Sequence, residues 1–289
     1  MKDSRGASAK CPVPAVSAIL TQTPTPALDS PLLLPLVALA AAAGAAINAV
    51  AGGGTLVTFP ALVALGVPPV AANATSTVAL WPGTMASMWG YRAELRGARR
   101  WARVWAVPSL LGGVIGALLL LRTPERRFEQ IVPWLILGAT ALFMLQQPVL
   151  RLLREHAPHR SIALADGTLA PPPAPYLLYQ LLVGVYGGYF GAGAGILMLA
   201  ALGLMGLTNI HQMNGLKNWG GGLMNLVAVL VFAVSGIVHW PIALAMAVGA
   251  TAGGIGGSLL AQRVGQTWVR RAVVAIGLGS GIAMLAGLI

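Results

Sequence analysis

The chain has 289 residues, of which 57% are hydrophobic and only 9% are charged, and its mean hydropathy is +0.78. So few charges cannot solvate the surface of a soluble domain, so the composition indicates an integral membrane protein. The net charge of +11 comes from basic residues that lie mostly in short loops between apolar segments. Basic residues in short loops are typical of the cytoplasmic side of membrane proteins, and this distribution argues against nucleic acid as a partner.

Residues 1–30 are rich in Ser, Thr and Pro and are predicted to form a disordered tail. Continuous apolar segments follow, which predicts an all-α polytopic membrane protein, because a barrel would show alternating strands of about ten residues. A polar, proline-rich linker at 151–176 separates a first transmembrane repeat (31–150) from a second (177–289). The apolar segments lie near 31–50, 55–66, 70–91, 104–121, 131–150, 177–190, 195–207, 210–234, 237–261 and 270–289.

The two halves match each other at one fixed offset of 141 residues. Gly52 corresponds to Gly193, and Asn73 corresponds to Asn214. The same offset continues without a gap through Gly112, Gly113 and Gly116 of the first half, which fall on Gly253, Gly254 and Gly257. A fixed offset held over this length indicates that the chain arose by duplication of an ancestral half.

The orientation of the halves depends on the short segments 55–66 and 195–207. Each is long enough for about 18 Å of helix, which suggests a half-helix or part of a broken span. If both count as crossings, the protein has five plus five helices in an inverted repeat. The arginine-rich loop 92–103 has a counterpart near 233–244 without Lys or Arg, which favours this arrangement. An eight-helix, four plus four parallel repeat is the alternative.

One strongly charged side chain, Lys217, is embedded in an apolar segment, and all seven acidic residues lie in the tail or in loops. Charge at membrane depth costs at least about 2.5 kcal/mol, so an intramembrane lysine suggests a functional site. His211, Asn214, Asn218 and Asn225 form a helical stripe beside it. The alternative interpretation is that the amides hold helices together and that the lysine reaches an interface.

The repeat strengthens the functional interpretation of this stripe. Each of Asn214, Lys217, Asn218 and Asn225 has a polar counterpart 141 residues earlier, which predicts a polar cavity shared by the two halves. These counterparts are Asn73, Ser76, Thr77 and Thr84.

Glycine clusters precede both short segments. The first contains Gly52, Gly53, Gly54 and Thr55, and the second contains Gly191, Gly193 and Gly195. Helix N-termini inside the membrane direct free N–H groups and a positive dipole end toward an anion, and glycine permits close approach. The same glycines would also suit tight helix crossing, which is the structural alternative.

Chemistry other than binding has little support in the sequence. Cys11 is the single cysteine, and the four histidines are scattered, so no metal site, cofactor or catalytic residue is predicted and the chain is not expected to be an enzyme. His211 is a candidate proton relay because it shares the polar stripe.

Several motifs together resemble the TauE/SafE-type sulfite exporter family over about residues 35–289. They are AGGGTLVTFPAL, NATST at Asn73–Thr77, FGAGAG and HQMNGLKN. The resemblance implies a multi-span permease for sulfite, sulfonates or related sulfur-containing anions.

The sequence therefore predicts a secondary transporter that exports a small anion, such as sulfite or an organosulfonate, across the bacterial inner membrane. The substrate would lie between the two polar stripes and the two glycine-led helix ends. A passive anion channel and an importer of organic anions are the alternatives. The expected partners are the substrate and the lipid bilayer, and a homodimer is one option for the oligomeric state.

Overall fold

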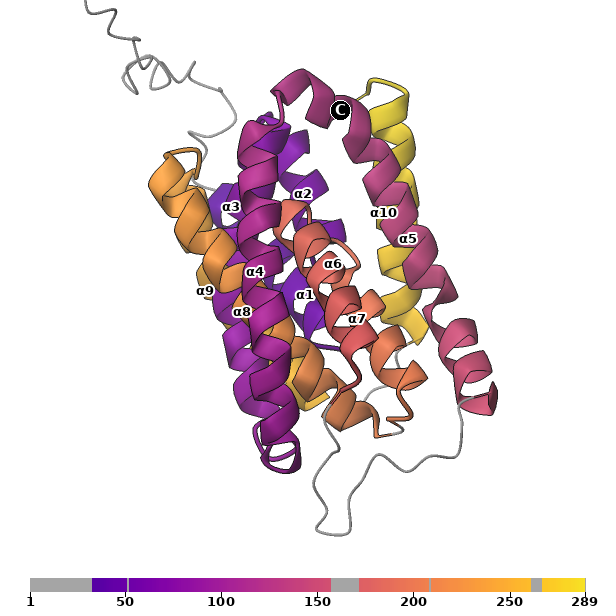
Figure 1. The fold of residues 1–289 in the computed structure, drawn as a ribbon. Helices are drawn as coiled ribbons and strands as arrows, with labels where there is room; N and C mark the ends of the chain where they lie inside the picture. Colours follow the sequence, from indigo (N-terminus) through magenta and orange to yellow (C-terminus); the bar gives the residue numbers. More distant parts are fainter. Residues whose placement is uncertain (1–32, 51, 157–171, 208, 261–266, 289) are drawn as a thin grey trace, which may run out of the picture.

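The computed structural model describes residues 33–50, 52–156, 172–207, 209–260 and 267–288 (Figure 1). Over these residues the chain forms α-helices and contains no β-strand, which confirms the predicted all-α polytopic class. The predicted tail at 1–30 and most of the predicted linker at 151–176 lie outside the described residues. The helices are α1 (Leu33–Val50), α2 (Thr55–Ala64), α3 (Pro69–Gly90), η2 (Arg96–Ala98), α4 (Arg99–Arg122), α5 (Glu125–His156), α6 (Ala174–Tyr189), α7 (Ala194–Leu204), α8 (Ile210–Ser235), α9 (Trp240–Leu260) and α10 (Thr267–Leu285).

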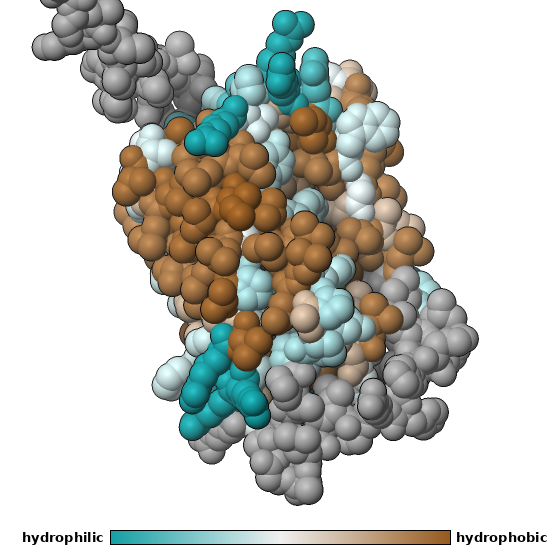
Figure 2. Space-filling view, in the orientation of Figure 1, coloured by the Kyte–Doolittle hydropathy of each residue, from teal (hydrophilic) through white to brown (hydrophobic). Residues whose placement is uncertain are grey.

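Helix lengths separate full spans from half-spans. Among the described helices, α4, α5, α8 and α9 are long and apolar enough to cross a membrane. In contrast, α2 and α7 have 10 and 11 residues. Each covers about 15 Å, half of a hydrocarbon core about 30 Å thick. Figure 2 shows a broad band of hydrophobic residues between hydrophilic groups at the two ends of the molecule.

The ends of two long helices differ from the predicted segments. The apolar segment predicted from residue 104 is preceded by a helical turn, because α4 begins at Arg99, and α5 continues to His156 rather than ending at residue 150. Long basic side chains can keep their charged ends in water while their stems lie along apolar surface, so a helix need not end where charged residues begin.

Small residues allow the helices to approach closely. α1 packs against α9, and α4 packs against α6. A side-chain carbon added at Gly253 of α9 would overlap the backbone of Ala42 in α1, and one added at Gly112 of α4 would overlap Gly184 in α6. Gly112 and Gly253 correspond at the offset of 141, so matched glycines create equivalent helix contacts in the two halves.

The helix boundaries follow the same offset. α1 and α6 begin at residues 33 and 174, α3 and α8 at 69 and 210, and α4 and α9 at 99 and 240. These three pairs of equivalent helices therefore begin 141 residues apart.

α3 and α8 are antiparallel. Tyr91, which follows α3, lies beside Gly215 near the start of α8. The backbone N–H of His239, which follows α8, donates to Thr75 Oγ1 near the start of α3 (3.1 Å). The α3–α4 connection and the α8–α9 turn therefore lie at opposite ends of the bundle (Figure 1). Equivalent helices that run in opposite directions support the inverted repeat, which remains a prediction.

We expect the α3–α4 connection to face the cytoplasm and the α8–α9 turn to face the opposite side. A membrane-impermeant thiol reagent should then label Gly97→Cys and Ser235→Cys from opposite sides, in a Cys11→Ser background. Ser235 suits this test better than Gly236, whose φ of 77° favours glycine. Labelling of both positions from one side would contradict the inverted repeat and leave the parallel alternative.

Candidate functional site

Two helix breaks meet in the interior of the bundle. α1 ends at Val50 and α2 begins at Thr55, while α6 ends at Tyr189 and α7 begins at Ala194. Gly52 lies directly against Gly195, since a Cβ added at Gly52 would be 2.6 Å from the Gly195 Cα. Gly52 also has a φ of 83°, which side chains other than glycine rarely adopt. Glycine is therefore required here for both conformation and close approach.

Lys217 binds the end of the first broken helix. Its Nζ donates to the carbonyl oxygens of Asn48 (2.8 Å) and Ala49 (3.1 Å) in the last turn of α1. The side chain is 3% exposed, so it points into the protein and does not reach an interface. The carbonyl end of a helix carries a partial negative charge, and the ammonium group compensates it.

An equivalent contact holds the second broken helix. Asn73 Nδ2 of α3 donates to the carbonyl oxygen of Tyr189, the last residue of α6 (2.9 Å). Tyr189 corresponds to Asn48 at the offset of 141, and Asn73 belongs to α3 as Lys217 belongs to the equivalent helix α8. Each broken helix therefore ends on a polar side chain supplied by the other half.

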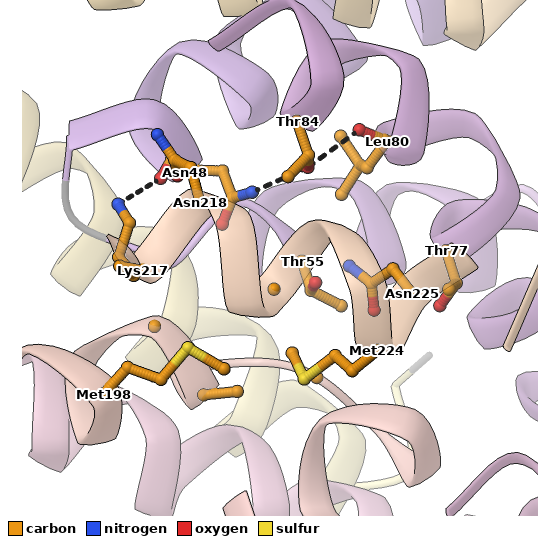
Figure 3. Close-up of a pocket in the computed structure, with 14 residues that line it drawn as sticks. Asn48, Thr55, Thr77, Leu80, Thr84, Met198, Lys217, Asn218, Met224 and Asn225 are labelled. Atoms are coloured by element: carbon orange, nitrogen blue, oxygen red, sulfur yellow. Dashed lines mark hydrogen bonds between the residues drawn. The ribbon is translucent and has the colours of Figure 1, made fainter. Parts of the chain in front are cut away.

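A small cavity lies beside Lys217, where α2 and α7 begin. Its volume is about 40 Å³, which is enough for a few water molecules. In Figure 3, Asn48, Thr84, Lys217 and Asn218 lie on one side of the cavity, while Met198 and Met224 lie on the other. The lining residues are Asn48, Thr55, Thr77, Leu80, Thr84, Gly191, Ala194, Gly195, Met198, Lys217, Asn218, Gly221, Met224 and Asn225.

Hydrogen-bond donors remain available at this cavity. Asn218 is 2% exposed, and its Nδ2 is buried and has no hydrogen-bond partner among the described residues. An ammonium group has three N–H donors, and the α1 carbonyls occupy two of those on Lys217. Thr55 and Ala194, the first residues of α2 and α7, also line the cavity. Buried donors, a positive charge and helix N-termini together make a site suited to an anion.

Five of the residues predicted to bind substrate line this cavity. They come from both halves: Thr55 and Thr77 from the first, and Gly195, Lys217 and Asn218 from the second. Thr77 Oγ1 donates to the carbonyl oxygen of Asn73 one turn earlier (2.9 Å), which fixes its side chain.

The other predicted glycines are not among the described residues that line the cavity, and they pack against neighbouring segments at the two helix breaks. Gly52 contacts Gly195, and Gly53 faces the ring of Phe143. Gly54 lies against Gly44 of α1, and Gly193 lies against Ala139 of α5 with a φ of 78°.

Three other predicted polar residues also lie outside the cavity lining. Asn73 binds the end of α6, and Ser76 Oγ lies 2.6 Å from Thr58 Oγ1 of α2. Asn214 is 3% exposed, and its Oδ1 is buried with no hydrogen-bond partner in the part of the chain that the structure describes. Asn73 and Ser76 therefore bond to neighbouring helices, and none of these three side chains is among the described residues that line the cavity.

The candidate proton relay, His211, lies in the first turn of α8 and not among the lining residues. Its ring stacks on that of Tyr91, with ring centroids 6.4 Å apart. Its backbone N–H donates to Asn209 Oδ1, which caps the helix (3.0 Å).

The sequence interpretation missed Asn48, which organises the polar side of the cavity. Its Nδ2 donates to Thr84 Oγ1 (3.3 Å), and its carbonyl oxygen accepts from Lys217. An amide inside an apolar segment next to the glycine cluster was a signal that could have identified it. Thr84 and Asn225 also line the cavity; the sequence predicts both on the polar stripes but not among the binding residues.

A multi-helix membrane bundle in which two broken helices meet at a buried polar cavity is the architecture of a transporter. Within the described ranges, no group of three or more His, Cys, Asp or Glu residues is placed to hold a metal ion. Residues 36–284 match the model of the sulfite exporter TauE/SafE family. The chain belongs to this family, and it is a membrane transporter.

Similar proteins carry the same general description. A probable membrane transporter protein of Haemophilus influenzae is 30% identical over 232 residues, covering 79% of this chain and 85% of the relative. The probable membrane transporter protein YfcA of Escherichia coli is 28% identical over 248 residues, covering 86% of this chain and 87% of the relative. No solved structure matches the chain significantly.

Proposed function

We propose that this protein is a secondary transporter that exports a small anion, sulfite or a related sulfur oxyanion or organosulfonate, across the bacterial inner membrane. The observation that carries the proposal is the pair of buried donors, Lys217 Nζ and Asn218 Nδ2, at the cavity where α2 and α7 begin. The name of the family supports a sulfur-containing anion.

The oxygens of the anion would accept hydrogen bonds from the remaining N–H of Lys217, from Asn218 Nδ2 and from Thr55 Oγ1. These contacts would replace part of the hydration shell that the anion loses in the membrane interior. The carbonyl oxygens of α1 and the anion would then share one ammonium group. Binding of the substrate would therefore weaken the hold of Lys217 on α1, which couples occupancy of the cavity to the position of a broken helix.

The lining favours an anion over a cation. No carboxylate is among the described residues that line the cavity, and sodium sites and the proton relays of most pumps use one. A coupled proton would most simply travel on the substrate, as it does on bisulfite, since His211 lies outside the lining.

The methionine side of the cavity bears on the choice of substrate. Met198 and Met224 lie opposite Asn48, Thr84, Lys217 and Asn218 (Figure 3), and their thioethers are flexible and apolar. A short organosulfonate would direct its charged group to Lys217 and its carbon atoms to the methionines. Sulfite would use the polar side alone, and the small volume of about 40 Å³ favours it and other compact anions.

Binding to purified protein tests the proposal. We expect sulfite, thiosulfate, sulfoacetate or taurine to raise the thermal unfolding temperature in a saturable manner, because a ligand that binds only the folded state stabilises it. Sodium chloride at equal ionic strength is the control for a general effect of salt on charge interactions in the protein. If none of these compounds stabilises the protein beyond the salt control, the proposed substrate class is wrong.

A further inference from the structure

An open cleft lies outside the transport cavity, at the end of the bundle that contains the α3–α4 connection. Its volume is about 380 Å³, against about 40 Å³ for the cavity. The two sites share none of their lining residues: Trp219 lines the cleft, while the two residues before it on α8, Lys217 and Asn218, line the cavity. The cleft is lined by Arg92, Leu95, Arg99, Ala102, Arg103 and Trp219.

Three arginines line this cleft, and no carboxylate is among the described residues that line it. Glu94 belongs to the same connection, but it does not line the cleft. Arg92 is held in place, since it donates to the carbonyl oxygen of Trp89 (2.9 Å) and lies over its ring, 4.8 Å from the centroid. A guanidinium group can bind two phosphate oxygens at once through parallel N–H donors, so a cleft lined by three arginines has the chemistry of a phosphate site.

The surroundings of the cleft match the depth of a lipid headgroup. Trp89 is 69% exposed in the last turn of α3, and exposed indoles lie at the level of the headgroups. Trp219 Nε1 donates to the carbonyl oxygen of Ala102 in the first turn of α4 (2.8 Å). This hydrogen bond joins two residues that line the cleft and so ties α8 to the start of α4.

Along one exposed face of α4, charged residues near the start of the helix are followed by apolar residues. Arg99, Arg103, Val107 and Leu111 recur at every fourth position and are all exposed, with Val107 at 60% and Leu111 at 55%. Residues four apart on a helix lie close to one face. Along this face, positive charge at the helix end gives way to apolar surface toward the membrane centre. A phospholipid has the same order of phosphate and acyl chain, whereas free phosphate would make no use of the apolar part.

We propose that this cleft binds an anionic phospholipid, with the phosphate on Arg92, Arg99 and Arg103 and an acyl chain along Val107 and Leu111. Basic pockets between transmembrane helices on the cytoplasmic side are suited to such headgroups. The site lies where α4 packs against α8, the helix that carries Lys217, so the lipid would stabilise that contact.

Native mass spectrometry of the purified full-length protein, titrated with phosphatidylglycerol or phosphatidylcholine, tests the proposal. We expect tighter binding of phosphatidylglycerol, and a loss of about tenfold or more in the R92Q/R99Q/R103Q variant. The R122Q/R126Q/R127Q variant removes equal charge from exposed arginines that do not line the cleft and should bind like the parent. Arg99→Gln against Arg100→Gln repeats the comparison for adjacent residues, because Arg100 does not line the cleft.

Three results would overturn the proposal. Equal losses in the two triple variants would show a general effect of net charge. Equal binding of phosphatidylglycerol and phosphatidylcholine by the parent would show that the cleft does not select an anionic headgroup. Displacement of phosphatidylglycerol by millimolar inorganic phosphate would assign the cleft to free anions. Thermal unfolding of each variant in lipid-free detergent confirms that a loss of binding does not come from misfolding.

Discussion

Lys217→Met should bind the substrate anion about ten to one hundred times more weakly than the parent protein. A hydrogen bond to a charged group contributes about 1.5–3 kcal/mol, which corresponds to this range of affinity. Methionine keeps the length and apolar character of the lysine stem. It lacks the ammonium group, which is the expected partner of the anion. The measurement is the dissociation constant for the anion that most stabilises the parent protein, obtained by titration calorimetry.

Folding of this variant needs a separate control, because Lys217 also binds the end of α1. Loss of the ammonium leaves the Ala49 carbonyl oxygen without that donor, at a cost of about 1–3 kcal/mol, while the removal of a buried charge offsets part of this cost. Lys217→Arg keeps the charge with a different donor geometry, so it should retain part of the binding. Unchanged affinity in a folded Lys217→Met protein would show that the lysine serves only α1.

Asn218→Leu should fold as well as the parent and bind the anion about tenfold more weakly. The Nδ2 donor of Asn218 has no hydrogen-bond partner in the described structure, so its replacement by an apolar group of similar shape leaves no partner unsatisfied there. Binding would lose one hydrogen bond to a charged ligand, worth about 1.5–3 kcal/mol. The unfolding temperature of the variant checks that it folds like the parent, and the dissociation constant measured on the same preparation checks the weaker binding.

Asn214→Leu is the matched control for this variant. Asn214 lies one turn earlier on α8, is buried to the same degree and does not line the cavity. It should therefore change anion affinity little. If Asn214→Leu weakens binding as much as Asn218→Leu, the polar stripe acts through the packing of α8 and not through direct contact with the anion.

Much of the fold could be predicted from the sequence, because each helix is itself an apolar segment. The short segments 55–66 and 195–207 correspond to α2 and α7, and the spacing of polar residues placed Lys217 and Asn218 on one helix. The offset of 141 reappears in the helix starts because equivalent apolar segments end at equivalent turns. These features depend on local sequence, so they could be predicted without knowledge of the three-dimensional structure.

Contacts between the halves were harder to predict. No local pattern could show that Lys217 binds the last carbonyl oxygens of α1, because Asn48 and Ala49 lie far away in the sequence and their side chains play no part in that bond. Gly53 and Gly193, which the sequence places among the candidate substrate-binding residues, lie against Phe143 and Ala139. Composition alone cannot distinguish glycines that face a ligand from glycines that face another helix.

Protein-dependent transport of sulfite in proteoliposomes tests the central claim most directly. With labelled sulfite on one side and an imposed pH gradient, we predict saturable accumulation by the parent and by Asn214→Leu, and much slower accumulation by Asn218→Leu. Flux that neither saturates nor accumulates against a gradient would indicate a channel. Sulfite movement equal to that in protein-free liposomes would contradict the proposal that this transporter carries sulfite.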